Sequence, residues 1–484
     1  MGMNRRDFVK SSALATAAIG FPNILRAGSP NEEIRIACVG IKGRGTSHIA
    51  GHQGQDNVRV VALCDVDEDV LNGRAKSFEK KYDLKVDRVK DLRKLLERDD
   101  IDAVSLATPN HQHAIQSIWA AQAGKDVYVE KPVSHNVWEG RQLVNAARKY
   151  DRIIQTGTQS RSSPSLKEAA EFVQAGKLGK IQYAVGTCYK PRKSIGKLDK
   201  PLDISDSIDY DLWCGPAAKV DLYRPKLHYD WHWDFNTGNG DMGNQGIHQM
   251  DIARWFLGED ELSPVIFSLG GRLGYEDAGN TPNTQTVYHG YKNAPLIFET
   301  RGLPTSKEAQ KSGWKPMDNY RGSRVGVIVQ CEDGYVVIPS YTSVKAYDNN
   351  GKEIEKWSGG GNHFKNFISA VRSRKKSDLN AEILDGHLSS ALCHTGAISH
   401  QMGSKMSADQ IAAQIKDNAL FAESFDRMAK HLEANGVDVE TASITAGPML
   451  EMDPKTERFT NNDEANELLT RNYRKPFVVP EINS

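Results

Sequence analysis

Hydrophobic and polar residues follow two alternating patterns in the first third of the chain. Short, almost continuous apolar runs predict strands at Ile34–Val39, Val58–Cys64, Ala103–Ala107, Val127–Val129 and Ile153–Gln155. Between these runs the spacing is helical, at Thr46–His52, Asp67–Tyr82, Leu92–Arg98, His111–Ala123 and Val137–Tyr150. Apolar strands separated by helices are typical of a parallel sheet covered on both faces. We therefore expect a doubly wound α/β domain over residues 33–155.

After Thr156 the strands become longer and often follow one another without a helix. They are predicted at Ile181–Lys190, Val265–Gly270, Thr284–Tyr291, Leu296–Thr300, Arg324–Gln330 and Tyr335–Pro339. Helical patterns return at Asn362–Arg372, Asp385–Gln401 and Phe421–Ala434. This predicts an α+β domain with a large, mostly antiparallel open sheet over residues 156–402. Residues 403–484 are expected to pack on both domains, either covering a pocket or forming an oligomer interface.

The first residues have the layout of an export signal. Arg5 and Arg6 precede Ser11–Leu25, which carries no charge, and the pattern Asn4–Lys10 resembles the twin-arginine signal of folded, exported proteins. We expect a signal at residues 1–27 and a periplasmic protein; the alternative is an ordinary basic helix. The uncharged stretch is shorter than the about 20 residues of a transmembrane helix, so no stable membrane insertion is expected after signal removal.

Composition narrows the function classes. The 62 basic and 62 acidic residues balance to a net charge of zero, which argues against a general nucleic-acid binder. With 39% hydrophobic residues among 484, the chain is an ordinary globular protein long enough for two or three domains. The 6 cysteines are scattered without a C-x-x-C pair, so buried free thiols are favoured over a disulfide framework.

A glycine-rich turn follows the first predicted strand and opens a helix. Gly40, Gly43 and Gly45 surround Arg44, and Asp65 ends the next strand. Such a turn brings backbone N–H groups close to a pyrophosphate, as in Rossmann folds. Asp65 can bind the adenosine ribose and would repel a 2′-phosphate, which favours NAD over NADP. Lys42 holds the position of the usual second glycine; Lys42 and Arg44 either contact phosphate or face solvent.

Two further loops follow later strands of the same predicted sheet. One carries Thr108, Asn110 and His113, and the other carries Glu130 and Lys131. Ligands bind at the carboxyl ends of strands in such sheets, so these side chains are candidates for the cofactor site. For Glu130 and Lys131 the alternative is a structural ion pair.

Four motifs together resemble one oxidoreductase family, the glucose–fructose oxidoreductase, inositol dehydrogenase and rhizopine-catabolism (Gfo/Idh/MocA) family. They are Gly40-x-x-Gly-Arg-Gly45, Thr108-Pro109-x-x-x-His113, Glu130-Lys131-Pro132 and Gly246-Ile247-His248-Gln249-Met250-Asp251. The resemblance runs from about residue 33 to the C-terminal helices. It implies an NAD(P)-binding Rossmann domain followed by an open-sheet substrate domain, with Lys131 orienting a sugar hydroxyl, His248 as general acid/base and Gln159 near the nicotinamide. Many relatives have Asp where this chain has Asn244.

The chemistry of these residue types agrees with the resemblance. Oxidising an alcohol removes a hydride and a hydroxyl proton; a histidine suits the proton transfer, and an ammonium stabilises the developing alkoxide. Asn244 and His248 are spaced i,i+4 and can face one cleft. Trp231 and Trp233 lie in an aromatic stretch that fits sugar stacking, although a loop anchor or a dimer contact is an alternative.

The sequence thus predicts an exported oxidoreductase that transfers a hydride between tightly bound NAD and a sugar or glycoside, as a dimer or tetramer. A glycosidase that uses NAD transiently and a non-catalytic sugar-binding protein are the alternatives. The pairs His111/His113 and His228/His232 have ligand-like spacing, but no set completes a tetrahedral site, so no metal is expected.

Overall fold

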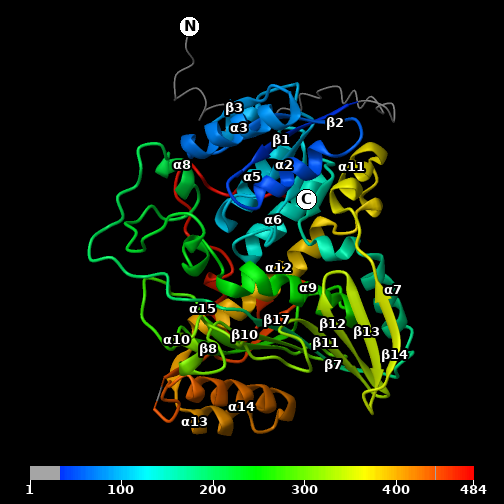
Figure 1. Ribbon diagram of the computed structural model, residues 1–484, viewed down its shortest axis with the longest axis vertical. Coiled ribbons are helices and arrows are strands. Elements are labelled where there is room, and N and C mark those ends of the chain that lie inside the picture. Colours follow the sequence, from blue (N-terminus) through cyan, green and yellow to red (C-terminus); the bar gives the residue numbers. More distant parts are fainter. Residues whose placement is uncertain (1–32, 442, 484) are drawn as a thin grey trace.

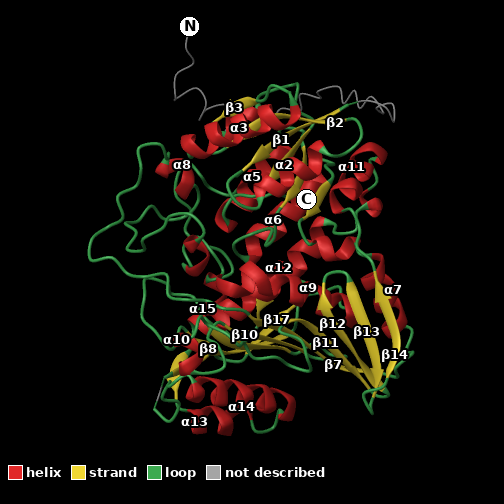
Figure 2. Cartoon of the chain, viewed as in Figure 1, coloured by secondary structure: helices red, strands yellow, loops and turns green. Residues whose placement is uncertain are grey.

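The computed structural model describes residues 33–441 and 443–483 as two sheet-based layers stacked along the long axis (Figure 1). The predicted export signal at residues 1–27 lies outside the described residues. The Rossmann domain occupies one end of the molecule and a much larger sheet occupies the other, and helices fill the space between them (Figure 2).

The first sheet has six parallel strands in the order β3-β2-β1-β4-β5-β6. Its strands are β1 (Ile34–Val39), β2 (Val58–Cys64), β3 (Asp87–Val89), β4 (Ala103–Leu106), β5 (Asp126–Val129) and β6 (Ile154–Thr156). Its helices are α2 (Gly45–Gln53), α3 (Glu68–Tyr82), α4 (Leu92–Leu96), α5 (Asn110–Gln122) and α6 (Val137–Lys149). This order reverses between β1 and β4, where Rossmann folds bind dinucleotides. The predicted doubly wound fold is confirmed. Of the six strands, β3 was not predicted, because it is short and polar and has no apolar pattern.

The second sheet has twelve strands and is mostly antiparallel, which confirms the second predicted fold. Its strands are β7 (Ile181–Tyr189), β8 (Val265–Gly271), β9 (Thr284–His289), β10 (Leu296–Arg301), β11 (Val325–Cys331), β12 (Gly334–Ser340), β13 (Ser343–Asp348), β14 (Glu353–Ser358), β15 (Ser404–Met406), β16 (Ile444–Ala446), β17 (Leu450–Asp453) and β18 (Arg458–Phe459). Only β7 and β10 pair in parallel. The sequence pattern missed β13 and β14 because the outermost strand, β14, is largely exposed and charged.

Helices cover both faces of this large sheet. One face packs against α7 (Pro164–Gln174), α9 (Ile247–Leu257) and α12 (Ile383–Gln401). The other face packs against α13 (Ala408–Ile415) and α14 (Ala419–Ala434), which lie beneath it in Figure 1. The remaining described helices are η1 (Gln159–Ser162), α8 (Tyr210–Cys214), η2 (Asp230–Trp233), η3 (Met242–Gly246), α10 (Lys307–Lys311), α11 (His363–Ser373), η4 (Lys376–Asp378) and α15 (Asp463–Glu467).

The C-terminal segment contacts both domains. Its residues 404–446 extend and cover the large sheet, whereas Phe477, Val479 and Ile482 pack into the core of the Rossmann domain. The backbone N–H of Ile482 donates to Gln142 Oε1 of α6 at 2.7 Å. The extension is therefore part of the monomer's own core.

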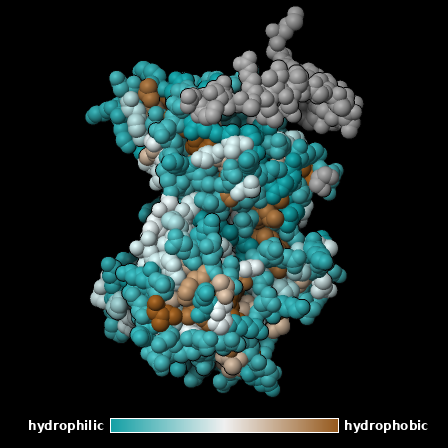
Figure 3. Space-filling view, turned by 90° about the vertical axis from the view of Figure 1, so that its right-hand side faces the viewer, coloured by the Kyte–Doolittle hydropathy of each residue, from teal (hydrophilic) through white to brown (hydrophobic). Residues whose placement is uncertain are grey.

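The surface and the thiols agree with an ordinary globular protein. The face drawn in Figure 3 is mainly hydrophilic, with hydrophobic residues in small separate patches. All six cysteines are buried free thiols, as the sequence predicts. Across residues 33–441 and 443–483, no helix has the length and apolar character that crossing a membrane requires.

Candidate functional site

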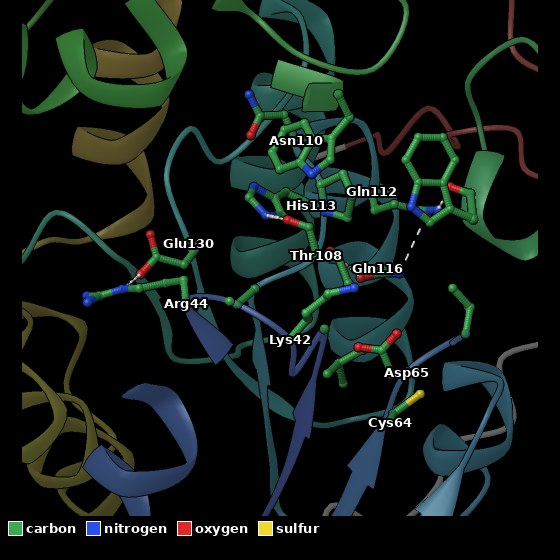
Figure 4. A pocket seen from close by; sticks show the side chains of 18 of the residues that line it. Lys42, Arg44, Cys64, Asp65, Thr108, Asn110, Gln112, His113, Gln116 and Glu130 are labelled. Carbon is green, nitrogen blue, oxygen red and sulfur yellow. Dashed lines mark hydrogen bonds and ion pairs between the residues drawn. The ribbon is translucent and has the colours of Figure 1, made fainter. Parts of the chain in front are cut away.

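A cavity of about 570 Å³ opens at the carboxyl ends of β1, β2, β4 and β5 and reaches into the second domain. This volume falls within the ~300–1,000 Å³ of typical small-molecule sites. We call the part beside Asp65 the Asp65 end, lined also by Lys42, Lys90 and Arg93. The part lined by Glu130, Lys131, Asn244, Gln245, His248 and Tyr341 is the Lys131 end. In Figure 4, Asp65 lies well apart from Glu130.

The glycine turn is shaped by close contacts that only glycine permits. Gly40 has a φ of +74°, and an added Cβ would lie 2.7 Å from the carbonyl carbon of Ala107. A Cβ on Gly45, the first residue of α2, would lie 2.0 Å from the carbonyl oxygen of Gly40. Gly43 differs, because it lines the cavity and a Cβ there would meet nothing within 4 Å. The turn therefore leaves free space over the start of α2, which fits a pyrophosphate.

Asp65 is held against this turn. Its Oδ2 accepts the backbone N–H of Ile41 at 2.9 Å, and its Oδ1 accepts that of Asp67 at 3.1 Å. Burial raises the pKa of Asp65, and these two hydrogen bonds oppose the rise. The carboxylate lines the cavity and keeps lone pairs for a ribose.

The cations around Asp65 have other acidic partners. Lys42 lies 4.0 Å from Asp67, Lys90 lies 2.8 Å from Glu68, and Arg93 lies 2.6 Å from Asp91. Asp65 itself makes no ion pair with any residue that the structure describes. At the Asp65 end, the three cations are thus each paired with another acid, and among the described residues the carboxylate of Asp65 is left without an ion-pair partner. A ligand with hydroxyl groups can donate hydrogen bonds to this carboxylate.

Three predicted residues of the next loop line the cavity, and one of them, Asn110, also contacts the second domain. Thr108, Asn110 and His113 all line the cavity. Asn110 Nδ2 donates to Oδ1 of Asn239 in the second domain at 2.9 Å. The ring nitrogens of His113 lie 2.7 Å from the carbonyl oxygen of Thr108 and 2.6 Å from that of Pro132, so His113 fixes the two loops relative to each other.

Arg44 extends away from Asp65 to the Lys131 end (Figure 4). Its Nε donates to Glu130 Oε1 at 2.7 Å, and buried His48 Nε2 lies 3.1 Å from the same oxygen. Burial disfavours the charged form of Glu130, but the His48 hydrogen bond and the charge of Arg44 outweigh it and hold the pKa of Glu130 well below 4.5. Glu130 is therefore an ionised anchor, and Arg44 is its partner rather than a contact of the glycine turn.

Lys131 faces the second domain. Its Nζ donates to the backbone carbonyl of Asn244 at 2.6 Å, and burial lowers its pKa while Glu130 opposes that change. Asn244 lies in the π-helical turn η3, directly before α9. The predicted i,i+4 spacing to His248 therefore includes a wider turn than an α-helix has, although both residues line the cavity.

His248 is buried at the Lys131 end, with 6% of its surface exposed. Its Nδ1 is buried and has no hydrogen-bond partner among the described residues. The ring centroid of Tyr341 lies 5.0 Å away. Burial, and then the charge of Lys131, lower the pKa of His248 to about 3. The imidazole is consequently neutral at pH 7 and able to accept a proton.

Of the two tryptophans that the sequence predicts as substrate residues, Trp231 lines the cavity and Trp233 does not. Trp231 and Gln159 line the cavity, and the ring of Trp231 stacks on His232 with centroids 3.6 Å apart. Trp233 is only 5% exposed, does not line the cavity and packs beneath the guanidinium of Arg192 at 5.0 Å. Its surroundings are those of a core residue.

Several lining residues escaped the sequence analysis. Gln245, Tyr341, Trp213 and Phe477 come from four distant segments, and nothing in their local sequence marks them as functional. Phe477 belongs to the C-terminal segment, which therefore lines the cavity. Within residues 33–441 and 443–483, no group of three or more His, Cys, Asp or Glu side chains is arranged to hold a metal ion.

Comparison with known proteins identifies the family. The profile described as "Oxidoreductase family, NAD-binding Rossmann fold" (GFO_IDH_MocA) matches residues 34–158, and its companion "Oxidoreductase family, C-terminal alpha/beta domain" (GFO_IDH_MocA_C2) matches residues 173–298. Together the two ranges span 251 of the 484 residues, slightly more than half. The chain belongs to the Gfo/Idh/MocA oxidoreductase family.

Curated relatives cover several activities. A myo-inositol 2-dehydrogenase of Thermotoga maritima is 32% identical over 52% of this chain and 63% of its own length. A levoglucosan dehydrogenase of Pseudarthrobacter phenanthrenivorans is 25% identical over 37% of this chain and 38% of its own length. A glycosyl hydrolase family 109 protein of Shewanella pealeana is 29% identical over 31% of this chain and 38% of its own length. The chain thus spans less than two thirds of the length of each of these three relatives.

Solved structures share the fold. The WlbA dehydrogenase of Bordetella pertussis, in complex with NADH and UDP-GlcNAcA, covers 75% of this chain and 94% of its own at a TM-score of 0.54 and 18% identity. A 3-ketoreductase of Actinomadura kijaniata, in complex with NADP, covers 75% and 96% at a TM-score of 0.54 and 17% identity. The fold therefore accommodates either dinucleotide.

Proposed function

We propose that this protein is an exported oxidoreductase that transfers a hydride between tightly bound NAD and a hydroxyl or keto carbon of a sugar or glycoside. The observation that carries the proposal is the pairing of the Lys131 ammonium with the neutral imidazole of His248 at one end of a dinucleotide-sized cavity. The relatives named for inositol and levoglucosan support a polyhydroxylated substrate.

The roles of the side chains follow from their surroundings. Bound nicotinamide supplies the hydride acceptor or donor. His248 Nε2 accepts the proton of the substrate hydroxyl, because burial keeps the imidazole neutral. Lys131 gives one N–H to the carbonyl of Asn244 and directs its others at the substrate oxygen, where negative charge develops. The amide of Asn244 can orient a hydroxyl but supplies no charge to His248.

Asp65 supports NAD over NADP. A 2′-phosphate beside Asp65 would bring two like charges together, and the nearby Lys42, Lys90 and Arg93 are already paired with other acids. The two ribose hydroxyls of NAD could instead donate to the carboxylate. NAD is therefore the proposed cofactor.

The cavity supports tight retention of that cofactor. Residues 204–214, which we call the strap, lie against the start of α3: the N–H of Glu68 donates to Ser207 at 2.9 Å, and that of Asp209 donates to Val66 at 3.0 Å. His228 Nε2 donates to Asp67 at 2.8 Å. Arg474 of the C-terminal segment holds Asp211 of the strap at 2.8 Å. These contacts hold the strap, of which Leu212 and Trp213 line the cavity, against the start of α3, and we infer that the strap slows release of a bound dinucleotide.

Retention fits an exported enzyme that regenerates its cofactor by oxidising one sugar and reducing another. The test is to purify the full chain, denature it and identify the released nucleotide by mass spectrometry. We expect NAD or NADH in near-stoichiometric amount, and reduction of the bound nucleotide when sugars are screened. Protein that carries no nicotinamide nucleotide, or that carries it but reduces it with no sugar, would overturn the proposal. Cell fractionation tests the periplasmic location.

A second candidate is a glycosidase that oxidises a ring hydroxyl, eliminates the aglycone, adds water and reduces the product again. The similarity to a glycosyl hydrolase family 109 protein favours it, and an enclosed cofactor suits a cycle without net oxidation. Release of aglycone from an aryl glycoside without accumulating NADH would select this function. Accumulation of NADH with intact glycoside would select the oxidoreductase.

A further inference from the structure

Four histidines line the cavity, and their ring nitrogens differ in what they can offer a ligand. Both nitrogens of His113 lie against carbonyl oxygens, at 2.6 and 2.7 Å, and Nε2 of His228 donates to Asp67 at 2.8 Å. Nδ1 of His248 is buried without a partner among the described residues, so no contact there fixes which nitrogen carries the hydrogen. The fourth is His232, whose contacts define one donor nitrogen and one free acceptor nitrogen.

A single hydrogen bond fixes the tautomer of His232. Its Nδ1 lies 2.5 Å from the backbone carbonyl oxygen of Tyr229, three residues earlier. A carbonyl oxygen can only accept, so Nδ1 carries the hydrogen and Nε2 of the neutral ring carries a lone pair. Burial lowers the pKa of His232 to about 3, and the positive charge of Lys131 adds to this effect, so the ring is neutral at pH 7. His232 therefore presents an acceptor nitrogen that has no hydrogen of its own.

This nitrogen is open to the cavity, and its ring is held in place. Nε2 of His232 makes no hydrogen bond to any described residue and is not a fully buried atom, so a ligand in the cavity can reach it. The indole of Trp231 stacks on the imidazole, with centroids 3.6 Å apart and planes 20° apart. The ring of Tyr229 lies on another side, with a centroid distance of 4.8 Å. These contacts fix the direction of the lone pair, which lowers the entropic cost of binding a ligand.

His232 lies near the reacting groups of the proposed reaction. Lys131, His232 and His248 line the same cavity. The charge of Lys131 contributes to the lowered pKa of both histidines, so its ammonium is within electrostatic range of both rings. A pyranose carries several hydroxyls around one ring. A sugar that offers one hydroxyl to Lys131 and His248 therefore has others available for Nε2 of His232.

We propose that His232 is a substrate-binding residue that selects the sugar by accepting a hydrogen bond at Nε2 from one hydroxyl, at a carbon other than the one that is oxidised. This inference rests on the proposed function. A hydroxyl can donate this hydrogen bond, whereas an ether oxygen, a fluorine or a carboxylate cannot. The residue therefore selects a sugar with a free hydroxyl at that carbon. A ligand that displaces water but leaves Nε2 unpaired should bind more weakly, because an unpaired acceptor carries a desolvation cost.

The test measures binding of methyl glucoside and of its deoxy and deoxyfluoro analogues, modified at carbon 2, 3, 4 or 6, to the holoprotein. Binding is followed by fluorescence of the cavity residues Trp213 and Trp231. We expect a position at which both analogues bind roughly 2- to 10-fold more weakly than methyl glucoside, the range of one neutral hydrogen bond. Because fluorine cannot donate, equal losses identify the protein group as an acceptor, and this comparison needs no variant.

H232F then assigns the acceptor. Phenylalanine keeps a flat ring beside Trp231 but has no Nε2, so the two analogues at that position should bind as tightly as methyl glucoside, while losses at other positions persist. H400F is the matched control. Burial lowers the pKa of His400 as well, to about 4, but His400 does not line the cavity, so its analogue profile should equal that of the native protein.

The outcomes separate this inference from the proposed function. Failure of methyl glucoside to bind, deoxyfluoro analogues that bind as tightly as methyl glucoside at every position, or losses that all survive in H232F would overturn the inference. Reduction of the bound nucleotide with one analogue profile in native protein and H232F would overturn it and leave the proposed function standing. A loss that disappears in H232F and persists in H400F supports it even if no compound reduces the nucleotide, and that result would count against the oxidoreductase function alone.

Discussion

The two ends of the cavity differ in how their charges are balanced. At the Asp65 end, Lys42, Lys90 and Arg93 each have an acidic partner, and one carboxylate faces the cavity. At the Lys131 end, the ammonium of Lys131 donates a hydrogen bond to the backbone carbonyl of Asn244 and forms no ion pair with any described residue. Buried charge without a partner is costly, so it persists where a ligand or a reaction uses it. We therefore propose that the Asp65 end recognises the nucleotide and that the Lys131 end carries the chemistry.

Lys131→Met should have the largest effect, because it removes the ammonium that stabilises the alkoxide. We expect the single-turnover rate of nucleotide reduction to fall about 10²- to 10⁴-fold, while the amount of bound nucleotide stays the same. Lys80→Met, on the exposed surface of α3, is the matched control. A Lys131→Met rate within threefold of the native rate would contradict the assignment of chemistry to this end.

Gly43→Ala tests whether the glycine turn, next to the Asp65 end of the cavity, binds the nucleotide. Because a Cβ there meets nothing within 4 Å in the protein, thermal unfolding of the nucleotide-free chain should be unchanged. The methyl group would occupy space next to a pyrophosphate, so nucleotide affinity should fall about 10-fold, the effect of roughly 1.4 kcal/mol. Gly73→Ala is the control, since it also has open surroundings but lies in α3 away from the cavity. An unchanged nucleotide affinity in Gly43→Ala, measured by titrating nucleotide into the nucleotide-free chain, would show that the open space is not the phosphate site.

Acidification should destabilise the fold, and His248 should contribute. Burial lowers the pKa of His232, His248, His289 and His394 to about 3, so these residues stay neutral in the folded protein. The unfolded chain takes up their protons below pH ~6.5, so unfolding binds protons and stability falls as pH drops from about 6.5 towards 3. Each such histidine adds a slope of about 1.4 kcal/mol per pH unit.

Urea unfolding between pH 5 and pH 8 measures this slope, which should vanish for these histidines above pH ~7. His248→Asn should lower the slope by close to one proton, after allowance for the change in stability at pH 8. An unchanged slope would mean that the pKa of His248 is the same in the folded and unfolded chains, which contradicts the lowering of this pKa by burial.

His228→Gln should have the smallest effect. It weakens a half-buried contact between the stretch that follows the strap and Asp67, so release of bound nucleotide on dilution should become only about 2- to 5-fold faster. Tyr223→Phe is the control, because Tyr223 is exposed in the same segment and contributes only its backbone carbonyl to Leu198. An identical release rate in both variants would show that the His228–Asp67 contact does not contribute to nucleotide retention.

The local sequence pattern predicted which strand ends line the cavity. The glycine turn, Asp65 and the loops after β4 and β5 each lie at the end of a strand, and the parallel order of the sheet brings those ends to one edge. Arg44 is the exception: its backbone belongs to the turn, but its long side chain reaches Glu130. Side-chain direction depends on partners that sequence spacing does not reveal.

The Lys131 end was predicted only in outline. Lys131, Asn244 and His248 line one cavity, but Tyr341, which also lines it, comes from a strand end whose sequence carries no functional motif. Trp233, grouped with Trp231 by sequence, is buried under Arg192 instead. Neighbouring residues of an irregular segment point in different directions, and only packing decides which of them reaches the cavity.

The sequence by itself determined the two sheet types, the glycine turn and the residues at strand ends, because hydrophobic periodicity and glycine conformation act over a few residues. Tertiary structure decided the charge balance of the cavity, the contacts of the strap with the start of α3, the presence of Phe477 in the cavity wall, and the lowered pKa of His248. Those properties depend on burial and on distances between segments that lie hundreds of residues apart in the chain. Electrostatic energy depends on distance in space and on exclusion of water, and neither can be obtained from the order of residues alone.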